Sequence, residues 1–221
     1  MLIIKLLFEN LINSLKLNSK NKPFMKNQEI FLLKALLLNI KPKNCLEWGS
    51  GYSTVYFSDF IPRGSKWLAI EHSLKWSKKV KKMIDNSKVE IKFIPPNNSS
   101  WSNENDDGLY KNFVDYVEYP KVKAPFDFIL IDGRSRSACI KKALNFVSDQ
   151  GVVVLHDANR EFYHKNLNIF PNQIFFLIPG KEDKGLWIGT KKIKIESILN
   201  IENHKKIARL HNFFRRIRKF N

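Results

Sequence analysis

Two clusters of polar side chains in this sequence could do chemistry, and each directly follows a short apolar run. Their members are Asp132, Arg134, Arg136, His156, Asp157, Asn159 and Arg160. The pKa of an unperturbed histidine lies close to neutral pH, so His156 is the first candidate for a general base that removes a proton. Asp132 and Asp157 complete the candidate catalytic set.

The same aspartates also allow metal-assisted chemistry. Carboxylate and amide oxygens are the ligands that Mg²⁺ prefers, so Asp132, Asp157 and Asn159 could hold Mg²⁺ or another divalent cation. The carboxyl ends of parallel strands meet at one edge of a sheet, which would bring the two clusters together. Metal-free and metal-assisted catalysis are both consistent with this pattern.

Three arginines accompany the acids. The planar guanidinium groups of Arg134, Arg136 and Arg160 suit a carboxylate or a phosphate on a bound acceptor. The alternative is a network of ion pairs between these arginines and the neighbouring aspartates. Both interpretations are compatible with the sequence.

A glycine-containing turn follows another apolar run, in "CLEWGSGYST" at residues 45–54. Gly49 and Gly51 would let a ligand approach backbone N–H groups near the start of a helix. Glu71 ends the next apolar run, where a carboxylate can accept hydrogen bonds from both hydroxyl groups of a ribose. These residues favour a nucleotide-like cofactor, although a tight turn beside an unrelated acid has the same pattern.

The elements that position these residues can be read from the alternation of apolar runs with helix-like segments. Expected strands are 44–48, 66–71, 89–94, 126–132 and 151–157, and expected helices are 27–41, 53–61, 74–85 and 137–149. Such alternation predicts an α/β fold with a mostly parallel sheet and helices on both faces. The link between residues 172–180 and 185–192 is too short for a parallel crossover, so it predicts a C-terminal antiparallel hairpin.

Three features favour S-adenosylmethionine over a dinucleotide or a flavin. Glu47 precedes the first glycine, where it could attract the ammonium group of a methionine moiety. The third glycine of a dinucleotide fingerprint is absent, since residues 52–54 read "YST". The predicted hairpin is the third feature, because a dinucleotide fold would continue with parallel units.

The segments "LEWGSGYST", "IEH", "FDFILIDGRSRSACIKKAL" and "GVVVLHDANREFY" resemble the class I S-adenosylmethionine-dependent methyltransferases, and more narrowly small members whose fourth strand ends in Asp-Gly-Arg-x-Arg. "HDANREF" is loosely similar to the His-Asp-x-x-Arg segment of polysaccharide O-methyltransferases that act on glucuronoxylan. The resemblance implies a Rossmann-like seven-stranded sheet and O-methylation of a sugar, polysaccharide or other small hydroxylated acceptor. The cofactor contacts that it implies are Glu47, Gly49, Ser50, Gly51, Ser53, Glu71 and Asp132. The family's adenine-binding Asp is replaced by "IPPNN", where Asn97 or Asn98 could substitute.

Length, charge and cysteine content limit the domain organisation of the chain. The 221 residues carry a formal net charge of +17, and we expect one methyltransferase domain at 27–191. We expect an amphipathic helix and a link at 1–26. This helix would pack on the domain, on a second copy in a homo-oligomer, or on a membrane surface. A basic helical extension would occupy 192–221. Cys45 and Cys139 lack metal-ligand spacing, which suggests buried, reduced thiols in a cytoplasmic protein.

The basic tail at 204–221 contains no acidic residue and could bind an anionic partner or a membrane surface. An RNA or other nucleic-acid methyltransferase or binder is therefore the alternative function, and a non-catalytic cofactor-binding protein is a third. Against the nucleic-acid reading, the expected fourth strand ends in "IDGR" and lacks the Asn/Asp-Pro-Pro-aromatic pattern of amino-methylating enzymes.

Overall fold

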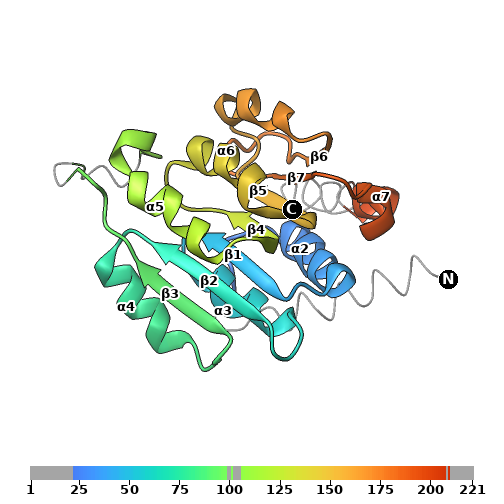
Figure 1. Ribbon diagram of the computed structural model, residues 1–221. Coiled ribbons are helices and arrows are strands. Elements are labelled where there is room, and N and C mark those ends of the chain that lie inside the picture. The colour runs from blue at the N-terminus through green and yellow to red at the C-terminus, as the bar shows by residue number, and fades with distance from the viewer. Residues whose placement is uncertain (1–21, 99–100, 102–105, 208, 210–221) are drawn as a thin grey trace, which may run out of the picture.

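The computed structural model describes residues 22–98, 101, 106–207 and 209. Its centre is a seven-stranded sheet in the order β3-β2-β1-β4-β5-β7-β6 (Figure 1). The strands are β1 (Asn44–Trp48), β2 (Lys66–Glu71), β3 (Val89–Phe93), β4 (Phe126–Ile131), β5 (Val147–His156), β6 (Asn172–Phe176) and β7 (Leu186–Thr190). The first five are parallel to one another, and β7 pairs antiparallel with both β5 and β6. The predicted sheet and its C-terminal hairpin are confirmed.

Helices cover both faces of the sheet (Figure 1). They are α2 (Asn27–Ile40), α3 (Tyr52–Phe57), α4 (Leu74–Met83), α5 (Val114–Glu118), α6 (Arg136–Phe146) and α7 (Ile195–Ile198). One core cluster joins α5 and α6 to side chains such as Trp48 and Ile129, and the other joins α2 and α4 to side chains such as Trp67 and Phe128. Strand residues thus alternate between two apolar layers, as a sheet buried on both faces requires.

Two stretches differ from the sequence expectation. The helix expected at 137–149 ends at Phe146, because Val147 already pairs with Phe126 and starts β5. The pairing of β4 with β5 then shifts register between Phe126 and Phe128, which accommodates the extra strand residues. Between β3 and β4, where no helix or strand is expected from the sequence, the structure contains α5 and short 3₁₀ turns at Tyr110–Asn112 and Tyr119–Lys123.

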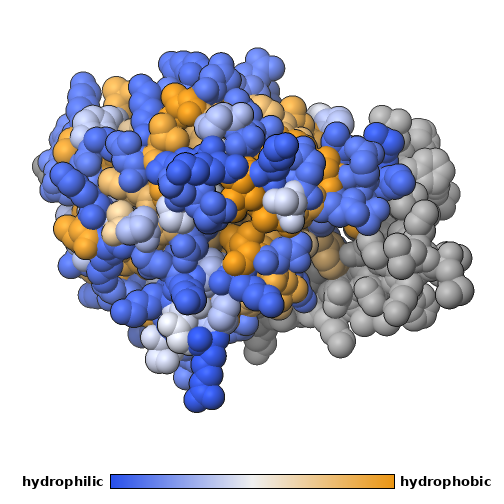
Figure 2. All heavy atoms as spheres, turned by 45° about the vertical axis from the view of Figure 1, so that its right-hand side comes forward, coloured by the Kyte–Doolittle hydropathy of each residue, from blue (hydrophilic) through white to orange (hydrophobic). Residues whose placement is uncertain are grey.

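The terminal extensions lie largely outside the described residues. The amphipathic helix expected before residue 22 and most of the basic tail fall there, while residues 201–207 are helical. Cys45 and Cys139 are free and buried. Figure 2 shows a largely hydrophilic surface with apolar side chains gathered near the middle of that face. None of the described helices is long and apolar enough to cross a membrane.

The turns after β1 and β4 pack backbone against backbone. Gly49 adopts φ +96°, and a Cβ there would lie 2.7 Å from Gly133 Cα and 2.8 Å from its nitrogen. A Cβ on Gly133 would in turn strike the Tyr116 hydroxyl and the Gly49 backbone. Gly51 is different, since a Cβ there would meet nothing closer than 3.9 Å. The fold therefore requires glycine at 49 and 133 but not at 51.

We expect Gly49→Ala to lower the free energy of unfolding by about 2 kcal/mol or more, because it adds both a left-handed strain and a backbone clash. Gly51→Ala is the matched control and should change that free energy by less than about 0.5 kcal/mol. Urea titration followed by circular dichroism measures both. Equal destabilisation by the two substitutions would contradict the glycine packing described here.

Candidate active site

The glycine turn is held in place by the acid at the end of β2. Glu71 accepts hydrogen bonds from the Ser50 nitrogen at 3.0 Å, the Ser50 hydroxyl at 3.1 Å and the Ser73 nitrogen at 2.9 Å. Although burial raises the pKa of Glu71, hydrogen bonding and charge from His72, together with the backbone donors, bring that pKa below its usual value. Glu71 is therefore an ionised carboxylate that shapes the turn where the sequence predicts a ribose contact.

Glu47 lies beneath this turn and is fully buried. Its carboxylate accepts hydrogen bonds from the Ser53 hydroxyl at 2.5 Å, the Thr54 hydroxyl at 2.7 Å and the Trp67 indole at 2.9 Å. Burial raises its pKa to about 8, against the lowering effect of these donors. This arrangement does not favour the expected direct contact between Glu47 and a cofactor ammonium, because protein donors already surround the carboxyl group. In the structure, Glu47 anchors the first turn of α3.

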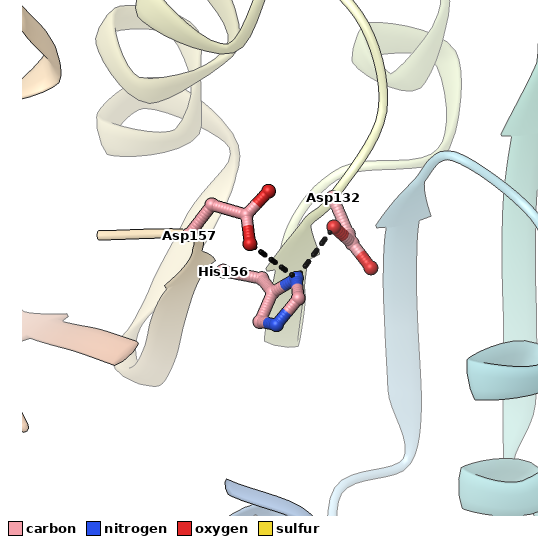
Figure 3. A group of neighbouring side chains, drawn as sticks. All are labelled: Asp132, His156 and Asp157. Atoms are coloured by element: carbon pink, nitrogen blue, oxygen red, sulfur yellow. Dashed lines mark hydrogen bonds and ion pairs between the residues drawn. The ribbon is translucent and has the colours of Figure 1, made fainter. Parts of the chain in front are cut away.

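The ends of β4 and β5 bring Asp132, His156 and Asp157 together (Figure 3). His156 Nδ1 lies 2.9 Å from Asp132 Oδ1 and 3.5 Å from Asp157 Oδ1. Asp157 adopts φ +58°, a left-handed conformation that Asp tolerates better than most residues, as the chain leaves β5. The structure thus joins the two polar clusters that the sequence placed at one edge of the sheet.

The guanidinium of Arg136 completes this cluster from the first turn of α6. It lies 3.3 Å from Asp132 Oδ1 and 3.1 Å from Asp157 Oδ2, and it donates to the backbone oxygens of Gly133 and His156. The side chain is only 8% exposed. The alternative interpretation of an internal ion-pair network is the one observed for Arg136, and its role in binding an acceptor anion stays a prediction.

His156 is buried and sits among acids on every side. Its Nε2 faces Glu29 Oε2 at 3.7 Å, opposite the two aspartates. Burial lowers the pKa of His156, but Asp132, Glu29 and Asp157 together raise it to about 10. The imidazole is then protonated at neutral pH and cannot accept a proton. This arrangement favours His156 as a cation that stabilises the carboxylates, and a role as general base stays a prediction.

The remaining predicted residues have different surroundings. The amide nitrogen of Asn159 donates to the Ile178 and Lys181 carbonyls at 2.7 and 2.6 Å, so this side chain anchors the hairpin connection and does not join the candidate metal ligands. Arg160 lies 3.4 Å from Asp157 Oδ2 and is 34% exposed. The Arg134 guanidinium lies over the Trp101 ring at 5.8 Å. Arg134 and Arg160 are only partly buried, and their role in binding an acceptor stays a prediction.

The site includes residues to which no sequence motif pointed. Glu29, on α2, accepts hydrogen bonds from the Lys26 and Gly185 nitrogens besides facing His156. Asp107 accepts from the Arg136 nitrogen at 3.0 Å. Glu29 follows a helix start at the spacing of an N-terminal capping acid, which was its only signal in the sequence. Asn97, considered for adenine binding, exchanges side-chain hydrogen bonds with Asp115 and so caps α5.

Solved structures with the same architecture have low sequence identity to this chain. An O-methyltransferase from Bacillus cereus in complex with SAH is 18% identical, with 84% of this chain and 90% of that chain covered at a TM-score of 0.57. A putative caffeoyl-CoA O-methyltransferase from Staphylococcus aureus is 17% identical, with coverages of 83% and 98% and a TM-score of 0.58. TomG from Streptomyces achromogenes, an O-methyltransferase in complex with SAM, is 15% identical, with coverages of 78% and 83% and a TM-score of 0.56.

No protein-family model and no curated protein matches the sequence. The likeness to solved structures establishes the fold: the chain has the Rossmann-like fold of the class I methyltransferases, as the sequence resemblance implied.

We expect Arg136→Met to lower the free energy of unfolding by about 3–5 kcal/mol at neutral pH, because it removes one of the two cations that the Asp132 and Asp157 carboxylates share. Arg160→Met, at a partly exposed pair, should cost less than about 1 kcal/mol. Asp132 has a lowered pKa, since His156 and Arg136 outweigh the effect of burial. Removing Arg136 raises the pKa of Asp132, so the deficit should shrink as pH falls and the carboxylates take up protons.

Urea titrations of both variants at several pH values provide the measurement. A deficit in Arg136→Met that is no larger than that in Arg160→Met, or that grows as the pH falls, would show that the buried carboxylates do not depend on this guanidinium.

Proposed function

We propose that this protein is an S-adenosylmethionine-dependent O-methyltransferase acting on a hydroxyl group of a sugar, a polysaccharide or another small hydroxylated molecule. One observation carries the proposal. The Gly49–Gly51 turn and the ionised carboxylate of Asp132 lie at the same edge of a methyltransferase-like sheet. Neighbouring solved structures named as O-methyltransferases in complex with SAH or SAM support the same reaction class.

The cofactor would lie over the turn between β1 and α3. Backbone N–H groups and the amino end of a helix suit the carboxylate of a methionine moiety, and the absence of a side chain at Gly51 permits close approach. Ser50 and Glu71 form the neighbouring wall, and Glu71 is the candidate for the ribose hydroxyl groups. The Trp76 indole donates to the Ser50 carbonyl at 2.6 Å and so fixes the turn from α4.

Methyl transfer is an in-line displacement, so the protein must chiefly align the acceptor oxygen, the methyl carbon and the sulfur. As the oxygen–carbon bond forms and the carbon–sulfur bond breaks, the acceptor hydroxyl becomes an oxonium, whose proton is strongly acidic. A weak base then suffices to take that proton. Asp132 is ionised and its side chain is 22% exposed, which makes it the group that accepts the proton in our proposal.

The metal alternative can be tested against the ligand set. Asp132, His156 and Asp157 place ligand atoms within 4.8 Å of one another, and Asp157 Oδ1 is buried without a hydrogen-bond partner among the described residues. The two carboxylates are nevertheless compensated by Arg136 and by protonated His156, and Asn159 turns away. A divalent cation at these carboxylates would compete with the guanidinium that already pairs with both of them. We therefore propose metal-independent transfer.

Gly51→Ala tests the cofactor turn without disturbing the fold. We expect calorimetry to show that it weakens S-adenosylmethionine binding about tenfold or more, because the added methyl group occupies the space of close approach. The unfolding curve of the same variant is its control. Glu71→Ala is less discriminating, since it also removes the acceptor of the Ser50 nitrogen. Unchanged affinity in a stable Gly51→Ala variant would exclude this turn as the cofactor site.

A methyl-release assay across pools of saccharides, phenols, peptides and RNA tests the reaction class. We expect turnover with the saccharide pool, no loss on adding a chelator, and a fall of about a hundredfold or more in Asp132→Asn, which cannot accept the proton. Activity that the chelator abolishes and Mg²⁺ restores would contradict metal independence. Transfer confined to RNA would contradict the choice of acceptor.

A further inference from the structure

Helix α4 has an exposed face that is made almost entirely of lysine. The exposed lysines of this helix are Lys75, Lys78, Lys79, Lys81 and Lys82. The helix contains no acidic residue, and no ion pair between described residues involves any of these lysines. Their spacing of three and four residues puts them on one side of the helix, opposite the buried Ser77 and Val80.

The lysines of α4 stand out by their density, because five exposed lysines lie on one short helix that has no acidic residue. Some lysines elsewhere in the domain pair with acids, as Lys142 does with Glu118 and Lys192 with Asp149. The like charges on α4 repel one another within a few ångströms, at a cost to helix stability. An anionic partner would relieve this repulsion.

Apolar side chains accompany the lysines. Leu74, at the first turn of α4, is 48% exposed on the lysine side of the helix. Phe24 is 76% exposed and packs edge-on against Tyr52 at 5.2 Å, and Tyr52 in turn lies 6.3 Å from Trp76 of α4. A row of aromatic rings therefore connects the exposed Phe24 to the helix that carries the lysines.

We propose that this surface, the lysine side of α4 with Leu74 and Phe24, docks the protein on an anionic lipid bilayer. Lysines on an amphipathic helix are attracted to anionic headgroups, and exposed leucine and phenylalanine side chains can enter the boundary between headgroups and acyl chains.

The composition of the surface favours lipid over nucleic acid. Bidentate recognition of a phosphate uses the planar fork of arginine, and α4 has no arginine. Lysine supplies a compact point charge on a flexible stem, which is enough for a fluid layer of headgroups. The exposed Leu74 and Phe24 would gain little beside a phosphate backbone, whereas a bilayer would bury them.

The experiment is co-sedimentation of the full chain with vesicles of phosphatidylcholine alone or with about 30% phosphatidylserine. We expect binding to the anionic vesicles only, falling about tenfold or more in Lys75→Glu/Lys78→Glu/Lys82→Glu and weakening at high salt. A control of equal charge change is Lys121→Glu/Lys141→Glu/Lys165→Glu, at exposed lysines away from α4, which should bind nearly as the wild type does. Phe24→Ser/Leu74→Ser should weaken binding at constant charge.

Equal loss in the two lysine triples would assign the attraction to net charge and overturn the proposal, as would undiminished binding in the α4 triple. Fluorescence anisotropy with a single-stranded RNA oligonucleotide tests the competing hypothesis that this surface binds RNA. Affinity for RNA that depends on the α4 lysines, without affinity for vesicles, would also overturn the proposal. Calorimetry with S-adenosylmethionine on the α4 triple reports on folding and on the cofactor turn, so failure of docking and failure of the proposed function remain distinguishable.

Discussion

A carboxylate withdrawn from water needs a positive charge or several donors beside it, and the carboxyl edge of this sheet buries such groups on four neighbouring elements. Glu47 receives side-chain donors, Glu71 receives backbone N–H groups and His72, and Asp132 and Asp157 share Arg136 and His156. Each of these pairings fixes a turn or a helix start. The geometry of the edge therefore follows from the way its buried carboxyl groups find hydrogen-bond donors or positive charge.

This constraint separates what the sequence could predict from what it could not. The strands and the hairpin were predictable, because the spacing of apolar residues and the length of a connection are local properties of the sequence. Each apolar layer needs only apolar side chains at the buried positions. The end-of-strand position of Asp132 and Asp157 was predictable for the same reason. Their partners were not: Arg136 and His156 could each serve a ligand or the protein, and only the distances decide between the two.

Residues that act over long separations in sequence escaped prediction altogether. Glu29 reaches His156 and the Gly185 nitrogen from a helix near the start of the domain, and no local pattern announces such a contact. Asn159 had the right chemistry and the right neighbours for a metal ligand. Its amide faces the hairpin connection instead, where the Ile178 and Lys181 carbonyls need a donor. A polar residue at a strand end therefore has two competing demands on it, a ligand and the loop that follows.

The compensation of charge also bears on the reaction we propose. Positive charge travels from the sulfonium to the acceptor oxygen and leaves as a proton, so the carboxylate that receives it must already be ionised when the methyl group moves. Arg136 and protonated His156 lower the pKa of Asp132, which weakens it as a base yet ensures that it carries its charge at neutral pH. Because the acceptor becomes strongly acidic during transfer, it matters more that Asp132 is ionised than that it is a strong base. Asp132 helps to raise the pKa of His156, which makes His156 unsuitable as the base, and protonated His156 in turn keeps Asp132 ionised.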